Sequence, residues 1–83
     1  MSYRVYILKS QKDGSYYIGH TLDIDSRLER HNQGRVKSTK GKRPWTLAYH
    51  EEYPDRSSAM AREEDIKKRK SKKFIDSLVR ASR

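Results

Sequence analysis

The strongest constraint on the fold lies near the start of the chain, where two strand-forming segments flank a turn. Residues 3–9 and 15–20 are rich in aromatic and branched side chains, and Asp13-Gly14 stands between them. This pattern predicts a β-hairpin, because such residues favour strands and Asp-Gly favours a tight reversal. If the connection has two or four residues, one face of the hairpin carries Tyr6, Leu8, Tyr17 and Gly19, and the more apolar face carries Val5, Ile7, Tyr16 and Ile18.

Beyond the hairpin, the sequence predicts a helix, a strand and two further helices. The expected ranges are about 23–33 for the first helix, 46–53 for the strand, and about 55–70 and 72–80 for the last two helices. Suitable N-caps stand at each helix start, namely Asp23 or Asp25, Asp55 and Ser71. In the last helix, Phe74, Leu78 and Ala81 are expected on one side.

The length and composition of the chain limit the class of protein. With 83 residues, the chain is expected to form one small domain over residues 1–83. Cysteine is absent, so disulfides, thiolate metal sites and cysteine nucleophiles are excluded. The longest apolar run, Val5-Tyr6-Ile7-Leu8, is too short for a membrane span or a signal-peptide core, and a cytoplasmic location is expected.

Positive charge is the most prominent feature of the composition. The chain has 20 Lys and Arg residues against 11 Asp and Glu residues, which gives a net charge of +9 spread along its length. Such a surface favours polyanions, and nucleic acid is the first candidate. The residues expected to contact phosphates lie in a long basic loop over 34–45 and in a later lysine-rich run; they are Arg35, Lys37, Lys40, Lys42, Arg43 and Lys67.

A few side chains could carry chemistry, and each also has an ordinary structural interpretation. Tyr6 and Tyr17 are expected close together on the hairpin, although buried strand tyrosines are common. Arg27 and His31 stand at i and i+4, so they can point along the same side of the first helix, as surface pairs also do. Glu63 falls on the apolar side of its helix, where a carboxylate needs either a salt bridge to a lysine or a hard divalent cation.

These residues resemble the motifs of the GIY-YIG endonuclease superfamily. Val5-Tyr6-Ile7 and Tyr17-Ile18-Gly19 are similar to the pair of motifs that names the family. Residues 23–28, 44–47 and 59–67 resemble, in the same order, the helix with the catalytic arginine, the entry to the third strand and the helix with the metal-binding glutamate. The chain departs from the first motif at Arg4, where the family name has a glycine.

The resemblance implies an α+β fold and a nuclease activity. The family fold is a three-stranded antiparallel sheet flanked by helices, which agrees with the predicted order of elements. The match assigns Tyr6 and Tyr17 to paired catalytic tyrosines, Arg27 to the catalytic arginine, His31 to a histidine that some members have one turn later, and Glu63 to the ligand of a Mg²⁺ or Mn²⁺ ion. The implied substrate is DNA, with RNA as the second choice, bound mainly through charge and with little sequence preference.

Two other functions fit the same sequence. A protein with this charge would bind DNA or RNA even without catalysis, so the chain could be a binding module, or a nuclease subunit that needs a partner. It could also dock onto a protein partner, although the sequence has no evident exposed apolar patch. Strand scission that depends on a divalent metal separates the nuclease from both alternatives.

Overall fold

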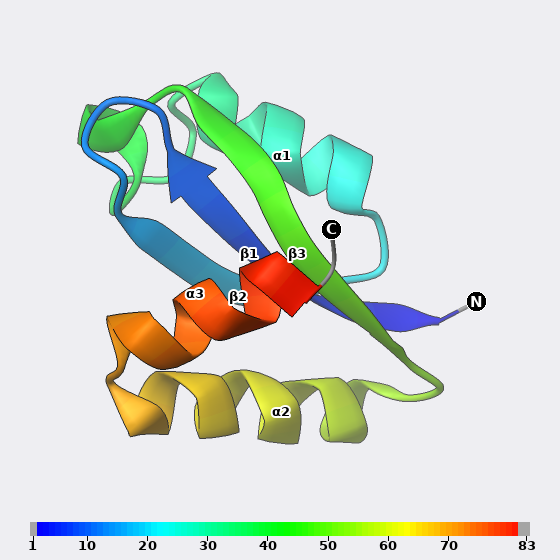
Figure 1. Ribbon diagram of the computed structural model, residues 1–83. Coiled ribbons are helices and arrows are strands. Elements are labelled where there is room, and N and C mark those ends of the chain that lie inside the picture. Colours follow the sequence, from blue (N-terminus) through cyan, green and yellow to red (C-terminus); the bar gives the residue numbers. More distant parts are fainter. Residues whose placement is uncertain (1, 82–83) are drawn as a thin grey trace.

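The computed structural model describes residues 2–81 and has helices on both faces of a single sheet (Figure 1). The elements are β1 (Tyr3–Ser10), β2 (Tyr16–Thr21), α1 (Ile24–Asn32), the short 3-10 helix η1 (Lys40–Lys42), β3 (Trp45–Tyr53), α2 (Arg56–Arg69) and α3 (Lys72–Ala81). The three strands are antiparallel, in the order β2-β1-β3. The predicted α+β class and the predicted order of elements are therefore confirmed. No helix within residues 2–81 is long and apolar enough to cross a membrane.

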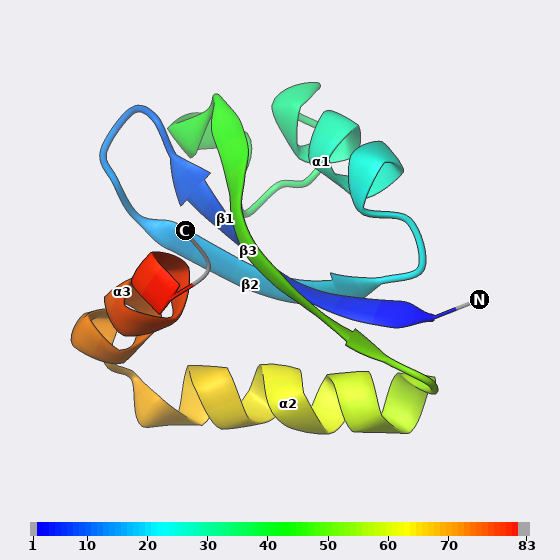
Figure 2. The ribbon, with the colours of Figure 1, turned by 45° about the vertical axis from the view of Figure 1, so that its right-hand side comes forward.

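The helices divide between the two faces of the sheet, so that both faces are covered (Figure 2). α1 lies over the face that carries Tyr6 and Leu8, which pack with Ile24 and Trp45. α2 and α3 lie over the opposite face, where the core consists of Val5, Ile7, Ala59, Ile66, Ile75 and Val79. The central strand β1 is thus shielded from water on both sides, which explains why its middle is a continuous apolar run.

The hairpin has the register that the sequence predicts for a connection of four residues. Tyr6 pairs with Gly19 across the two strands. The backbone N–H of Ser10 donates to the carbonyl of Ser15 at 2.8 Å, which leaves residues 11–14 as the connection. The predicted assignment of side chains to the two faces of the hairpin is therefore correct, and both motif tyrosines point to the face that α1 covers.

Side chains cap the helices as the sequence predicts. The carboxylate of Asp23 accepts the backbone N–H of Ser26 at 3.1 Å at the start of α1. The carboxylate of Asp55 accepts the backbone N–H of Ser58 at 2.7 Å at the start of α2. These bonds satisfy backbone donors that have no partner within the helix, and so they set where each helix begins.

The buried side of α3 differs from the prediction. The core residues are Ile75 and Val79, whereas Phe74 and Leu78 lie at the border of the core and Ala81 is exposed. Lys70 ends α2 in the left-handed conformation, with φ of 47°, and this turn sets the rotation at which α3 meets the sheet. Helical periodicity alone does not predict the rotation of α3 about its own axis relative to the sheet.

A network of polar side chains holds α2 against the edge strand β3. The carboxylate of Glu51 accepts hydrogen bonds from Arg62 at 2.9 and 3.1 Å and from the hydroxyls of Tyr49 and Tyr53. Burial raises the pKa of Glu51, but these hydrogen bonds outweigh burial and hold the pKa below its usual range. The network therefore stabilises the fold at neutral pH, and its contribution is lost as the pH falls through that lowered pKa.

An Arg62→Ala substitution is expected to lower the free energy of unfolding by about 2 kcal/mol, because it leaves the Glu51 carboxylate shielded and without its cation. The two side chains are only 24% and 17% exposed. The more exposed pair of Arg4 and Glu52 is the control, and Arg4→Ala is expected to cost less than about 0.5 kcal/mol. Urea denaturation of both variants measures the difference, and equal losses would contradict the expectation.

Candidate active site

Tyr6 can extend over β2 because its partner in the hairpin is a glycine. Tyr6 is 2% exposed and pairs with Gly19. A Cβ atom at Gly19 would lie 2.6 Å from the Tyr6 hydroxyl oxygen and 2.8 Å from its Cζ atom, closer than side chains tolerate. The bare backbone of Gly19 thus makes room for the ring. Since β2 is an edge strand, the hydroxyl group lies near the open edge of the sheet.

The hydroxyl of Tyr6 begins a buried chain of hydrogen bonds through His31 to the loop after α1. Its oxygen lies 3.3 Å from Nε2 of His31, and Nδ1 of His31 lies 2.8 Å from the hydroxyl oxygen of Thr39. Thr39 donates its own proton to the carbonyl of Val36 at 3.3 Å, so its oxygen accepts the proton of Nδ1. In this arrangement Nε2 of His31 carries no proton and accepts the hydroxyl of Tyr6.

Burial shifts the pKa values of both rings toward their neutral forms. Burial, followed by the charges of Arg27 and Arg30, lowers the pKa of His31, which is therefore neutral at pH 7. Burial also raises the pKa of Tyr6 well above its usual range, and neighbouring Tyr17 adds to this. Arg27 acts in the opposite direction, as a cation beside a phenol should, but burial outweighs it. Tyr6 is therefore a phenol at rest, because the positive charge of Arg27 does not offset burial at this ring.

Tyr17 lies beside the same histidine on the α1 face. Its ring centroid is 4.7 Å from that of His31 and 6.3 Å from that of Tyr6. Tyr17 is only partly buried, whereas Tyr6 is enclosed. The predicted proximity of the two tyrosines is confirmed, and the more accessible ring is that of Tyr17.

Arginines surround an open pocket at the edge of β2, next to these rings. The pocket has a volume of about 350 Å³, and its lining includes Arg27 and Arg30 from α1, Arg56 from α2, and His20 from β2. The positive charge of Arg27 also acts on the Tyr6 hydroxyl, where it lowers the pKa. A guanidinium presents a planar fork of donors that matches phosphate oxygens, so this pocket suits a phosphate group.

Glu63 reaches the same edge from the other face of the sheet. Its side chain is 15% exposed, with Oε1 2.6 Å from Nδ1 of His20 and Oε2 2.7 Å from Nζ of Lys67. Burial raises the pKa of Glu63, but the hydrogen bonds from Lys67 and His20 outweigh burial and hold the pKa below its usual range. The carboxylate is thus ionised, and its charge acts on the hydroxyl of Tyr6. The site therefore spans the β2 edge, with Tyr6 and Arg27 on one face and Glu63 on the other.

Known proteins resemble this chain in sequence and in fold. The family model described as the GIY-YIG catalytic domain matches residues 2–75. The chain belongs to the GIY-YIG family. Its relatives include UPF0213 proteins of Staphylococcus aureus strains Mu3 and N315, each 46% identical over 67 residues, which is 80% of this chain and 80% of the relative. A UPF0213 protein from Bacillus halodurans, solved by solution NMR, is 35% identical and superposes with a TM-score of 0.60 over 98% of this chain and 85% of the other.

GIY-YIG proteins are nucleases that generally use a divalent metal, and the residues at the β2 edge fit a small oxygen-bound cation. Mg²⁺ needs only one or two carboxylates because it keeps several of its waters, so Glu63 alone suffices on the protein side. Among residues 2–81, His, Asp and Glu side chains form no group of three that could hold an ion by themselves. The lysine salt bridge that the sequence left as the alternative is present: Lys67 bonds Oε2 and His20 bonds Oε1, so a cation at Glu63 would compete with both.

The basic loop of this GIY-YIG domain is ordered and lies between α1 and β3. Arg35, Lys37, Lys40, Lys42 and Arg43 are all exposed. Arg43 is nevertheless partly committed to the loop itself, because its Nε atom donates to the carbonyl of Lys40 at 2.8 Å and its guanidinium lies against Gly34. Lys42 lies 3.8 Å from Oδ2 of Asp13, and Lys67 is paired more closely with Glu63, at 2.7 Å. Their contacts with nucleic acid remain a prediction.

Three neighbours of the site carry little signal in the sequence. His20 follows the second motif. The alternation of side chains along β2 places it on the face that α2 covers, where it contacts Glu63. Thr39 lies in a loop without periodicity and is 1% exposed. Arg56 begins α2, far along the chain from α1. Only the position of His20 follows from strand alternation, whereas Thr39 and Arg56 come to the site through the tertiary fold.

Proposed function

We propose that this GIY-YIG protein is an endonuclease that hydrolyses phosphodiester bonds of DNA with one Mg²⁺ or Mn²⁺ ion, in the cytoplasm and within a single domain. The observation that carries the proposal is that His20 of β2 lines the Arg27 pocket and bonds Glu63 at 2.6 Å, while the charges of Arg27 and Glu63 both act on the Tyr6 hydroxyl. Phosphodiester hydrolysis needs an acceptor for the proton of the attacking water, charge relief at the phosphate, and help for the leaving oxygen. Tyr6, Arg27 and Glu63 offer one group for each need.

The proton of the attacking water passes along the buried chain of hydrogen bonds. The hydroxyl oxygen of Tyr6 takes this proton while its own proton moves to Nε2 of His31. This route avoids a free phenolate, which the raised pKa of Tyr6 disfavours. The lowered pKa of His31 keeps Nε2 available at neutral pH. Tyr17, the more accessible ring, orients the water toward Tyr6.

Arg27 holds the non-bridging oxygens of the scissile phosphate, and Glu63 would hold the metal ion. When bound, the ion would neutralise charge on the phosphate and on the leaving oxygen. Lys67 is displaced from Glu63 on binding and is then free to contact a neighbouring phosphate. The loop residues Arg35, Lys37, Lys40, Lys42 and Arg43 bind the nucleic-acid backbone without reading bases.

A Thr39→Val substitution is expected to lower the cleavage rate at pH 7 about tenfold to a hundredfold. Without its oxygen, Nδ1 of His31 loses the acceptor that holds its proton, and Nε2 is no longer fixed as the proton acceptor. Thr39→Ser keeps the hydroxyl and is expected to restore most of the rate. The check is the pH–rate profile of the three proteins.

In the unmodified protein, activity is expected to persist below about pH 6.5, the ordinary pKa of histidine, and to fall as the pH drops through the lowered pKa of His31. Arg27, Arg30, Tyr6 and Tyr17 surround this ring, and the two arginines oppose its protonation. A pH–rate profile for Thr39→Val that is identical to the wild-type profile in rate and in shape would show that His31 does not take part in the proton transfer.

The test of the proposed function is direct cleavage. Labelled single-stranded, duplex and branched DNA, with an RNA of the same sequence, are incubated with Mg²⁺ or Mn²⁺ or with a chelator. Scission that occurs with metal and stops with the chelator supports the endonuclease and identifies the preferred substrate shape. DNA that is bound but not cut in either metal would overturn the proposal for the isolated chain.

A second candidate function is a nuclease subunit that cuts only with a partner. The observation in its favour is the pair of Lys67 and Glu63, which occupies the proposed metal ligand. Weakening this pair by Lys67→Ala distinguishes the two cases. An isolated chain that is inactive as wild type and active as Lys67→Ala would indicate that a partner normally opens the pair.

A further inference from the structure

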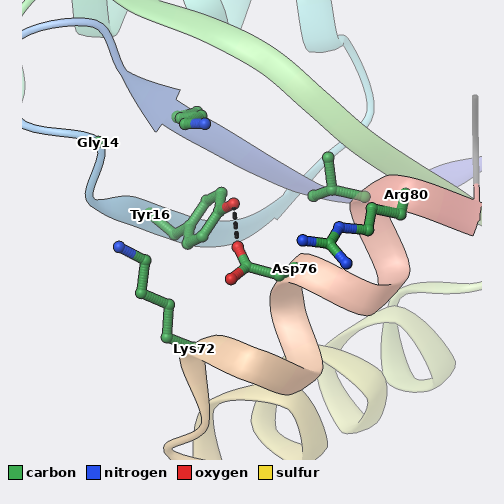
Figure 3. Close-up of a pocket in the computed structure, with 7 residues that line it drawn as sticks. Gly14, Tyr16, Lys72, Asp76 and Arg80 are labelled. Atoms are coloured by element: carbon green, nitrogen blue, oxygen red, sulfur yellow. Dashed lines mark hydrogen bonds between the residues drawn. The ribbon is translucent and has the colours of Figure 1, made fainter.

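A second pocket lies between the hairpin turn and α3, on the face of the sheet opposite α1 (Figure 3). Its volume is about 340 Å³, and its polar lining consists of Lys9, Tyr16, Lys72, Asp76 and Arg80. Three of these residues, Lys72, Asp76 and Arg80, come from one side of α3, and Figure 3 shows them facing Tyr16 of β2. The pocket thus joins the first hairpin to the last helix.

The pocket has more positive than negative charge. The hydroxyl of Tyr16 donates to Oδ1 of Asp76 at 2.5 Å, so this carboxylate is already engaged. Within the described part of the chain, none of Lys9, Lys72 and Arg80 has a carboxylate at ion-pair distance. Three cations around one cavity repel one another, and an anion bound between them relieves that repulsion.

A groove connects this pocket with the candidate active site. A neighbouring cavity of about 420 Å³ shares Tyr16 and Lys72 with the pocket. Its lining also includes two further lysines, one carboxylate and three isoleucines, namely Lys67, Lys70, Asp13, Ile18, Ile66 and Ile75. Lys67 is the residue that pairs with Glu63. Lys67, Lys70 and Lys72 outnumber Asp13 in this lining, so the cavity between Glu63 and the pocket has a net positive charge.

We propose that this pocket binds a backbone phosphate of the nucleic acid whose scissile phosphate lies at Arg27. The proposal rests on the proposed function for the identity of the ligand and extends it to a second contact. From Thr21, which lines the Arg27 pocket, to Tyr16, which lines the second pocket, β2 rises about 17 Å at roughly 3.3 Å per residue. Backbone phosphates of duplex DNA are spaced by about 3.4 Å along the axis, so the second phosphate lies roughly five nucleotides from the first. Arg80 and Lys72 of α3 bind this second phosphate.

The test compares two double variants that each remove two positive charges from the last two helices, α2 and α3. Lys72→Ala with Arg80→Ala removes cations that line the pocket, whereas Lys68→Ala with Lys73→Ala removes exposed cations outside its lining. Fluorescence anisotropy measures the binding of a labelled DNA of about 20 base pairs, long enough to reach both sites, at several salt concentrations with a chelator. Circular dichroism confirms that each variant is folded.

The pocket variant is expected to bind about tenfold more weakly, and its slope of log K against log salt should be smaller in magnitude by about 1, the loss of roughly one phosphate contact. The control pair should change the affinity less than about threefold. In a ¹⁵N-labelled protein, DNA should shift the backbone amide signals of Gly14 and Asp76, and the pocket variant should lose these shifts. Equal losses of affinity in the two variants, or unmoved amides at the pocket, would overturn the proposal.

The binding measurement tests the phosphate site separately from the proposed endonuclease activity, because the chelator prevents metal-dependent cleavage during the measurement. A wild-type protein that binds DNA through the pocket but never cuts refutes the endonuclease and retains the phosphate site. A protein that cuts DNA, and whose pocket variant binds as tightly as the wild type, refutes the phosphate site alone.

Discussion

Glu63→Gln is expected to reduce metal-dependent cleavage about a thousandfold, equivalent to about 4 kcal/mol of transition-state stabilisation. The substitution keeps the shape of the side chain and one acceptor oxygen, so His20 or Lys67 can still donate to it. It removes the negative charge that would hold a divalent cation. The measurement is the single-turnover rate of cleavage of the preferred DNA substrate in Mg²⁺ and in Mn²⁺.

The matched control for this prediction is the next residue. Glu64 is exposed on the same helix, and Glu64→Gln makes the same change of charge outside the site. It is expected to leave the rate within about twofold, as for a surface substitution. Both variants should bind DNA as tightly as the wild type or slightly more tightly, because a negative charge has been removed. Glu63→Gln with wild-type activity would show that this carboxylate does not hold the metal.

Gly19→Ala is expected to lower the cleavage rate about a hundredfold in a protein that still folds. The new methyl group would lie 2.6 Å from the hydroxyl oxygen of Tyr6, so the ring must move away. A displacement of about 1 Å at a reacting group costs about a hundredfold in rate. The same displacement would also lengthen the hydrogen bond from the Tyr6 hydroxyl to Nε2 of His31, which is already 3.3 Å. Because the ring is packed beneath α1, the variant should lose about 1–3 kcal/mol of stability.

Gly41→Ala is the control, since a Cβ atom there meets nothing within 4 Å. Its stability should change by less than about 0.5 kcal/mol and its rate by less than about twofold. Thermal denaturation of both variants sets a temperature at which each is folded, and rates are compared there. If Gly19→Ala is folded and fully active, the position of the Tyr6 hydroxyl over β2 has no part in catalysis.

Local patterns in the sequence predict the fold well because the elements are determined by neighbouring residues. The alternation of side chains along the hairpin places Tyr6 and Tyr17 on one face once the connection has four residues. Asp23 and Asp55 begin the helices where an N-cap is needed. The rotation of α3 could not be predicted in the same way, since it depends on the turn at Lys70.

The candidate site could be predicted only in part, and the limit lies in contacts between distant segments. Arg27 and His31 share one side of α1 because they are separated by one helical turn. No local pattern indicates that Thr39 would accept a hydrogen bond from His31, because a loop residue has no periodicity. The raised pKa of Tyr6 likewise depends on burial under α1, which a sequence does not display.

The hairpin, the assignment of its side chains to two faces, the helix caps and the types of side chain at the site follow from the sequence, because strand alternation and capping act over a few residues. The approach of Glu63 and Tyr6 to one strand edge from opposite faces, and the contacts of Lys67 and His20 with Glu63, emerge only when the helices pack on the sheet. Those arrangements depend on how α1 and α2 pack on the two sides of the sheet. That packing follows from burying both faces of β1 at once.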